Sequence, residues 1–203
     1  MTTAAAPQSV RAPRLWLVRH GETEWSRAGR HTGRTDVALT ATGERQARAL
    51  RDLLAGRHFE CVFCSPLRRA RDTCRLAGFE SADVRVLDDL MEWDYGECEG
   101  RTTAEIRTER PGWNIWEGPV PGGETLAEVG ARADRALHTI TQGQGEILVF
   151  AHGHLLRILT ARYLGLAARE GRSLILSAGS LGILGQEHGT PAIERWNCNR
   201  EPE

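Results

Sequence analysis

Short apolar runs that alternate with helical patterns are the feature that most constrains the fold of this chain. Three of these runs are LWLV (Leu15–Val18), CVFC (Cys61–Cys64) and EILVF (Glu146–Phe150). Each has the length of a buried strand, and apolar residues at helical spacing follow in the intervening sequence. This alternation predicts an α/β fold with a largely parallel sheet.

The other expected elements come from the same patterns and from helix start and stop signals. Ser65 and Pro66 resemble an N-cap and a first-turn proline, so a helix is expected to begin near Leu67. Residues 88–123 are rich in Gly, Pro and Trp and predict a loop-rich excursion. The remaining expectations are helices over 40–56, 103–109, 122–140 and 154–164, a short strand over 84–87, and two or three strands within 173–196.

Length and charge set the class of protein. A chain of 203 residues predicts one domain, over 14–203, after a disordered tail over 1–13. The formal net charge is −1, which does not indicate a nucleic-acid or membrane partner. No apolar run has the length of a signal peptide core or a membrane span, so we expect a cytoplasmic protein. The sequence is compatible with a homodimer and does not specify the oligomeric state.

The cysteines do not predict a metal or disulfide site. Five is an odd number, and three of them are scattered. Cys61 and Cys64 have CxxC spacing but lie on a predicted strand, where residues three apart face opposite sides of the sheet. We therefore expect neither a zinc site nor a metal cofactor.

Reactive side chains follow the ends of three predicted strands. Arg19 and His20 follow the first, Ser65 and then Arg69 follow the second, and His152 follows the third. One strand-end histidine alone is more often a structural group than a catalyst. Because functional sites in open parallel sheets form beyond the carboxyl ends of the strands, we expect these segments to meet at one rim.

This set of residues favours phosphate chemistry. All 26 basic residues are arginines, so any phosphate contact from a basic side chain comes from a guanidinium group. The N-termini of the helices after Ser65 and Gly153 are expected to present N–H groups to an anion. A neutral His20 imidazole is then a suitable nucleophile on phosphorus. Glu92, between Met91 and Trp93, is best placed to hold a proton and act as general acid, although an exposed loop carboxylate is the alternative.

Four motifs also resemble the histidine phosphatase superfamily, whose fold is phosphoglycerate mutase-like. They are VRHGETEW, SPLRRARDT, MEWDYGECEG and FAHGH, and the resemblance runs from about Arg14 to the end. It implies a three-layer α/β/α sandwich with a cap formed by the excursion. It also implies that His20 is phosphorylated, that Arg19, Arg69 and His152 bind the phosphoryl group, and that Glu92 is the acid/base. Substrate contacts are expected from Thr23, Ser26, Thr32, Gly33, Tyr95, Gly153 and His154.

Departures from the mutase pattern favour hydrolysis. Ser26 and His154 stand where the mutases have Asn, and Thr103 stands where they have Lys. A paired arginine segment of the mutases is also missing. We therefore predict a metal-independent phosphomonoesterase that acts on small phosphorylated metabolites. A phosphoglycerate mutase is the first alternative and a non-catalytic phosphate-binding protein is the second. Within the superfamily the motifs look closest to actinobacterial acid phosphatases and fungal-type sedoheptulose-1,7-bisphosphatases, and Arg101 and Arg107 are candidates to meet a second phosphate.

Overall fold

A six-stranded sheet forms the centre of the molecule in the computed structural model, which describes residues 12–80 and 84–199. The strand order is β3-β2-β4-β1-β5-β6. Strands β3, β2, β4 and β1 pair in parallel, whereas β5 and β6 pair antiparallel at one edge. The strands are β1 (Arg14–Arg19), β2 (Cys61–Cys64), β3 (Val84–Val86), β4 (Glu146–Ala151), β5 (Leu181–Glu187) and β6 (Thr190–Cys198). The predicted α/β fold with a mostly parallel sheet is confirmed.

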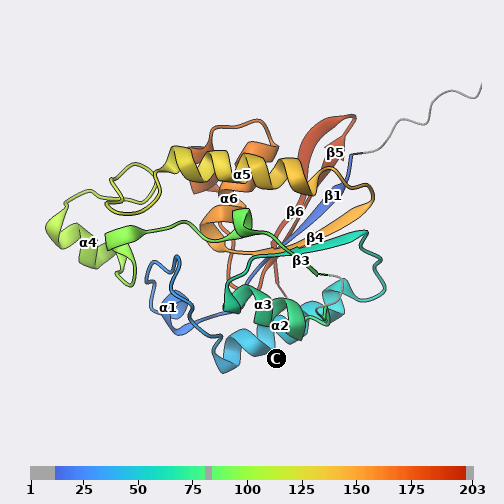
Figure 1. The fold of residues 1–203 in the computed structure, drawn as a ribbon, viewed down its shortest axis with the longest axis horizontal. Helices are drawn as coiled ribbons and strands as arrows, with labels where there is room; N and C mark the ends of the chain where they lie inside the picture. Colours follow the sequence, from blue (N-terminus) through green and yellow to red (C-terminus); the bar gives the residue numbers. More distant parts are fainter. Residues whose placement is uncertain (1–11, 81–83, 200–203) are drawn as a thin grey trace, which may run out of the picture.

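Helices cover both faces of this sheet, as Figure 1 shows. One face carries α2 (Ala41–Leu54) and α3 (Arg68–Leu76), and the other carries α5 (Leu126–Ile140) and α6 (Gly153–Tyr163). Side chains alternate along β1, so that Trp16 and Val18 belong to the core beneath α2 and α3. Leu15 and Leu17 belong to the core shared with α5 and α6. Two covered faces explain why the strands read as continuous apolar runs.

Local signals account for where the helices begin and end. The Thr40 hydroxyl caps α2 by accepting from the N–H of Gly43 at 3.0 Å. Gly56 follows the helix with a φ of +71°, a conformation that glycine adopts without strain. The short α1 (Glu24–Arg27) and α5 begin with capping boxes at Thr23 and Thr125.

The excursion between β3 and α5 is irregular but well packed. It contains the 3₁₀ turns η1 (Asp88–Leu90) and η2 (Gly96–Cys98) and the short helix α4 (Thr103–Glu109). The helix α4 lies at the left of Figure 1. Trp93, Tyr95 and Trp113 are buried in the same core as α5 and α6. The aromatic residues of the excursion therefore anchor it to the sandwich.

The expected role of Ser65 as the N-cap of α3 is wrong. The helix begins at Arg68 with Leu67 as its N-cap, and no side chain caps it. The Ser65 hydroxyl lies 2.7 Å from Nε2 of His152, on a neighbouring strand end. The Ser65 hydroxyl therefore contacts His152, which is distant in the sequence, and does not cap α3. Two elements outside the excursion were not expected, the short helix α1 and the 3₁₀ helix η3 (Ala168–Ser173).

The cysteines lie as predicted for a strand. Cys61 packs against the core beneath α5 and α6, whereas Cys64 belongs to the core beneath α2 and α3. All five cysteines are free. The predicted tail lies outside the described residues except for residues 12 and 13.

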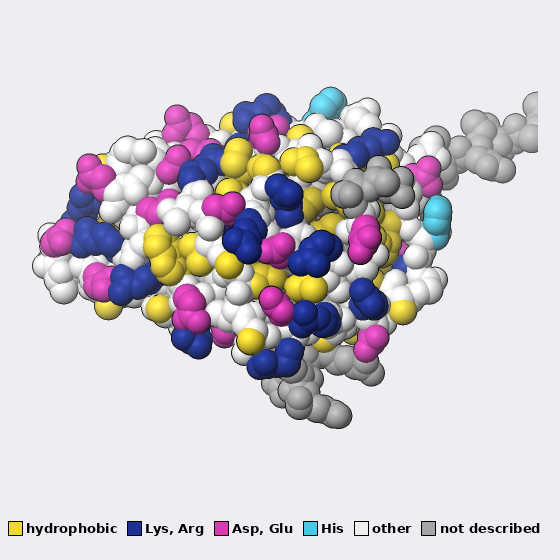
Figure 2. Space-filling model, turned by 60° about the horizontal axis from the view of Figure 1, so that its bottom comes forward, with side chains coloured by type: hydrophobic (Ala, Val, Ile, Leu, Met, Phe, Trp, Pro, Cys, Tyr) yellow, Lys and Arg dark blue, Asp and Glu magenta, His cyan; other side chains and the backbone are white. Residues whose placement is uncertain are grey.

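The surface is mixed in charge. On the face shown in Figure 2, arginine and acidic side chains are interspersed. In residues 12–80 and 84–199, no helix has both the length and the apolar character that a membrane span requires.

Candidate active site

The carboxyl ends of β1, β2 and β4 bring the predicted reactive residues to one rim. His20 lies beside Ala151, because its N–H donates to the Ala151 carbonyl at 3.0 Å. The His20 and His152 rings are 5.2 Å apart between centroids. Two histidines that are 132 positions apart in the chain therefore face each other, as the parallel sheet predicts.

His20 is held as a neutral imidazole with one free nitrogen. Its Nδ1 lies 2.7 Å from the Gly21 carbonyl oxygen, which can only accept, so this contact assigns the ring proton to Nδ1. Burial lowers the pKa of His20 well below its ordinary value, and the charges of Arg69 and Arg19 lower it further. The Nε2 atom consequently carries a lone pair, as a nucleophile requires.

The partly buried Arg19 and the fully buried Arg69 lie near His20 and have unused donors. Arg19 donates from Nη1 to the Leu176 carbonyl at 2.6 Å, and Arg69 donates only to backbone carbonyls. The Nε atom of each is buried and has no partner within the described residues. Burial lowers the pKa of both groups, and the charge of Glu92 opposes this. Their unpaired N–H groups suit an oxyanion.

His152 adds a third unpartnered donor. The Ser65 hydroxyl accepts from the Leu67 N–H at 3.3 Å, so its own proton can go to Nε2 of His152. Nδ1 of His152 then carries the ring proton, and this atom is buried without a partner in the described chain. Burial and the charge of Arg69 lower the pKa of His152 well below its ordinary value.

Glu92 lies at the N-terminus of α6. Its carboxylate oxygens accept from the N–H groups of Trp93, His154 and Leu155 at 2.9 to 3.1 Å. These contacts fix the carboxylate at the edge of the cavity, where the residue is 4% exposed. They also correct the expectation that the N-termini of α3 and α6 offer free N–H groups to a phosphate. The first N–H groups of α6 bind this carboxylate, and the N–H of Arg68 at the start of α3 binds Asp36 at 2.7 Å.

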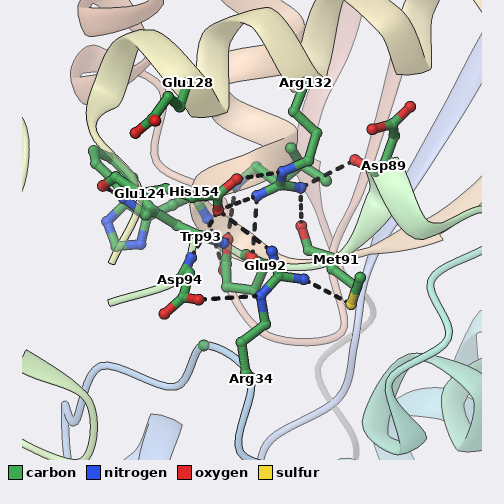
Figure 3. A network of polar contacts seen from close by, with 12 residues as sticks. Arg34, Asp89, Met91, Glu92, Trp93, Asp94, Glu124, Glu128, Arg132 and His154 are labelled. Atoms are coloured by element: carbon green, nitrogen blue, oxygen red, sulfur yellow. Dashed lines mark hydrogen bonds and ion pairs between the residues drawn. The ribbon is translucent and has the colours of Figure 1, made fainter. Parts of the chain in front are cut away.

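An ion pair between buried Arg132 and partly buried Glu124 lies next to the Glu92 segment, as Figure 3 shows. Arg132 on α5 donates to both carboxylate oxygens of Glu124 at 2.8 and 2.7 Å. The same guanidinium donates to the carbonyls of Asp89, Met91 and Glu92. Arg132 therefore fixes the backbone of the segment that carries the predicted acid.

Arg19, His20 and Glu92 line a cavity of about 430 Å³, whereas Arg69 and His152 are fully buried and are not among its lining residues. Five of the seven expected substrate contacts line it: Ser26, Thr32, Tyr95, Gly153 and His154. Thr23 is fully buried and caps α1, and Gly33 packs against Glu99, so the structure does not bring these two residues to the cavity wall. Arg107 and Trp116 line the cavity, whereas Arg101 pairs with Glu109 at 2.6 Å.

Tyr95 and His154 form one polar unit in the cavity wall. The Tyr95 oxygen lies 2.6 Å from Nδ1 of His154. Burial raises the pKa of Tyr95 well above its ordinary value, and burial lowers the pKa of His154 well below its own. The phenol therefore donates to Nδ1, and the proton of the neutral imidazole sits on Nε2.

Several cavity residues were missed by sequence reasoning. They include Arg30, His31, Asn114 and Arg157. Arg157 follows His154 by three residues on α6, so helical spacing places both on one face and was a usable signal. The others come from loops, where no periodicity predicts the direction of a side chain.

Within the described residues, no three His, Cys, Asp or Glu side chains are grouped so that they could hold a metal ion. The positive charge at the rim comes from arginine side chains. Metal independence stays a prediction, which the effect of EDTA on the rate tests.

Comparison with known proteins identifies the family. The sequence profile of the histidine phosphatase superfamily (branch 1) matches residues 15–199. An acid phosphatase of Mycobacterium tuberculosis is 44% identical over 198 residues, covering 96% of this chain and 97% of that protein. A sedoheptulose 1,7-bisphosphatase of Saccharomyces cerevisiae is 40% identical over 190 residues, covering 78% of this chain and 70% of that protein.

A solved structure agrees with these sequence matches. It is that of an open reading frame of Mycobacterium tuberculosis, with a TM-score of 0.86 at 40% identity, covering 92% of this chain and 98% of that one. Sequence and fold thus lead to the same conclusion that the four motifs suggested: the chain belongs to the histidine phosphatase superfamily and is a phosphatase.

Proposed function

We propose that this phosphatase hydrolyses small phosphomonoesters through a phosphohistidine on Nε2 of His20. One observation carries the proposal. Five buried polar side-chain atoms lack a partner in the described residues, and three of them are Arg19 Nε, Arg69 Nε and His152 Nδ1. Unpaired buried donors are rare in proteins. All three belong to residues near His20, since the His152 ring lies 5.2 Å from the His20 ring and the charges of Arg69 and Arg19 act on His20. Three such donors fit the oxygens of a phosphoryl group.

The first step transfers the phosphoryl group to the enzyme. The Nε2 lone pair of His20 forms a bond to phosphorus while the bond from phosphorus to the ester oxygen breaks. Protonated Glu92 gives its proton to the departing oxygen. The imidazole ring gains positive charge, which the Gly21 carbonyl at Nδ1 stabilises.

The second step returns the enzyme to its starting state. A water oxygen bonds to phosphorus, the bond between nitrogen and phosphorus breaks, and the Glu92 carboxylate takes one water proton. Inorganic phosphate leaves, and His20 is again neutral with its proton on Nδ1. Arg19, Arg69 and His152 hold the phosphoryl oxygens in both steps.

The test of the nucleophile is a His20→Ala variant with p-nitrophenyl phosphate as substrate. We expect kcat to fall by roughly 1,000-fold or more, because the covalent route is lost. His58→Ala changes an exposed histidine and serves as the control, with unchanged activity expected. EDTA should leave the wild-type rate unchanged. Retention of most activity by His20→Ala, or acid-stable label on protein treated with phosphorylated substrate, would contradict the mechanism.

The cavity also favours a substrate that carries a second anionic group. The guanidinium carbon of Arg157 lies 4.7 Å from the centroid of the Trp116 ring, and the guanidinium donates to the carbonyls of Gly171 and Arg172. Arg107 donates to the Trp113 carbonyl at 2.7 Å. These contacts fix both guanidinium groups without placing a carboxylate on them, which leaves positive charge beyond that needed for one phosphate. The similar bisphosphatase supports a sugar bisphosphate as the first substrate to test.

This specificity is tested with Arg157→Met. We expect its loss of kcat/KM on a sugar bisphosphate to exceed its loss on p-nitrophenyl phosphate by about 10-fold, because one charged hydrogen bond is removed. Arg162→Met is the matched control on the same helix. Arg162 pairs with Asp134 at a distance of 2.8 Å and is not among the residues that line the cavity. Equal losses on both substrates would refute the second anionic contact.

The mutase alternative is disfavoured by the cavity wall. Ser26, Thr103 and His154 all line the cavity, so the departures from the mutase pattern fall on the substrate side of the site. We expect release of inorganic phosphate, without interconversion of 2- and 3-phosphoglycerate, in an assay that follows both. The absence of turnover on every phosphomonoester tested would favour the non-catalytic alternative.

A further inference from the structure

The loop that holds Arg69 is itself held by a carboxylate. Glu99 accepts hydrogen bonds from three successive backbone N–H groups, those of Gly33, Arg34 and Thr35, at 3.0, 3.2 and 2.7 Å. Three charge-assisted bonds to one carboxylate fix the backbone of this loop. The carboxylate is half-buried and belongs to the excursion, so it reaches the loop from another part of the chain.

The opposite side of the same loop grips Arg69. The guanidinium donates to the carbonyls of Thr32, Gly33 and Thr35 at 3.0, 2.8 and 3.0 Å. The peptide groups joining Thr32 to Gly33 and Gly33 to Arg34 therefore point their N–H toward Glu99 and their C=O toward Arg69. Two whole peptide groups lie between a carboxylate and a guanidinium, with their dipoles aligned in the field of both charges.

This indirect pairing has a chemical advantage over a direct one. A guanidinium has five N–H donors, and the loop takes three of them. A carboxylate in direct contact would neutralise Arg69 and compete with phosphate for the remaining two. Glu99 stabilises the orientation of Arg69 through the loop and leaves the buried Nε atom unpaired.

Gly33 makes the close approach possible. A Cβ atom at this position would lie 2.6 Å from the Trp93 carbonyl oxygen and 2.7 Å from a carboxylate oxygen of Glu99. Any side chain here would push the loop away from Glu99 and move the carbonyls that orient Arg69. The role of Gly33 is thus in the geometry of the loop.

We infer that Glu99 is a positioning residue for the phosphate-binding Arg69 and acts through the peptide groups of residues 32–35. The inference rests on the proposed function, because it takes Arg69 as an oxyanion ligand. The ligand that reports on it is an oxyanion alone, since inorganic phosphate or orthovanadate can bind without turnover.

The primary experiment measures inorganic phosphate affinity by calorimetry and kcat/KM on p-nitrophenyl phosphate. Glu99→Gln keeps the shape of the side chain and removes its charge. We expect both quantities to fall by about 10- to 100-fold, the size of effect that misplacement of a binding group produces. Glu97→Gln, two residues away and exposed, is the control and should match wild type.

A double-variant comparison separates positioning from a merely structural role. In an Arg69→Met background, Glu99→Gln should change phosphate affinity by no more than about 2-fold, because the group that it positions is gone. An equal loss in both backgrounds would overturn the inference, as would wild-type affinity in Glu99→Gln. If Glu99→Gln does not fold, Glu99→Asp, which withdraws the carboxylate by one methylene, carries the same comparison.

Failure of the proposed function has a different signature. In that case the wild-type protein shows no turnover that depends on His20. A turnover that depends on His20, together with a phosphate affinity that is insensitive to Glu99, would reject the positioning role alone.

Discussion

Arg69 and Arg132 are both buried arginines that bind three backbone carbonyl groups, and they differ in one respect. Arg132 is 5% exposed and donates to both oxygens of Glu124, whereas Arg69 is 0% exposed and contacts no carboxylate in the described chain. A buried cation without a counterion is costly unless a ligand supplies one. The comparison separates a guanidinium that completes the fold from one that is available to a substrate.

The largest expected effect tests whether Arg69 binds the phosphoryl group. Arg69→Met should reduce kcat/KM on a phosphomonoester by about 1,000-fold, because a charged donor to the transferring group is lost. Its free energy of unfolding should fall less than that of Arg132→Met, since no buried carboxylate is left unpaired. Steady-state kinetics beside urea unfolding measures both quantities.

Arg71→Met changes an exposed arginine of the same helix and should match wild type in both measurements. A rate near that of wild type in Arg69→Met would mean that Arg69 does not bind the phosphoryl group.

The second expected effect tests whether Arg132 stabilises the fold. Arg132→Met should lower the free energy of unfolding by about 3–5 kcal/mol, because three backbone carbonyls lose their donor and the partly buried Glu124 keeps only the longer ion pair with Arg34 at 3.6 Å. Arg135→Met on the same helix removes an exposed pair with Asp89 and should cost less than about 1 kcal/mol. Similar losses in the two variants would show that the pair of Arg132 and Glu124 behaves as a surface pair.

The smallest expected effect is a dependence of the free energy of unfolding on pH, caused by the buried histidines near these arginines. Burial lowers the pKa values of His20, His152 and His154 well below the ordinary value of 6.5. Below pH 6.5 the unfolded chain therefore binds protons that the folded protein does not. Stability should be full above pH 6.5 and should decline as the pH falls below it, by up to about 1.4 kcal/mol per pH unit for each histidine.

Urea unfolding between pH 7.5 and 5 measures this slope in the protein without ligand. His152→Asn removes one of the three histidines and should give a shallower decline. A stability that is flat or rises toward acid pH would mean that these imidazoles are already charged in the folded state.

The site residues that could be predicted are those that directly follow the ends of strands. His20 and His152 follow apolar runs directly, and parallel pairing then brings them together without further information. Glu92 was singled out from the neighbouring carboxylates because it lies between Met91 and Trp93, and its motif also resembles that of the family.

The supporting residues were not predictable, for a physical reason. Glu99 and Arg132 reach their partners across 64 to 66 and across 40 to 43 positions, through contacts to backbone atoms. Backbone groups are the same at every residue, so the sequence contains no matching partner to detect. Ser65 was misplaced because its local capping signal was read without the distant His152 that it contacts.

The cavity wall and the reacting groups come largely from different parts of the chain. This separation has a consequence for how substrate preference can change among related proteins. The stretch around α4 and the following turn supplies Thr103, Arg107, Asn114, Ile115 and Trp116 to the wall but none of the reacting groups. It begins after Glu99 and ends before Glu124. We expect that this stretch can be exchanged between relatives as a unit when the buried Ile106 and Trp113 are kept as anchors. Such an exchange should change the substrate preference and leave the reacting groups, which lie outside the stretch, in place.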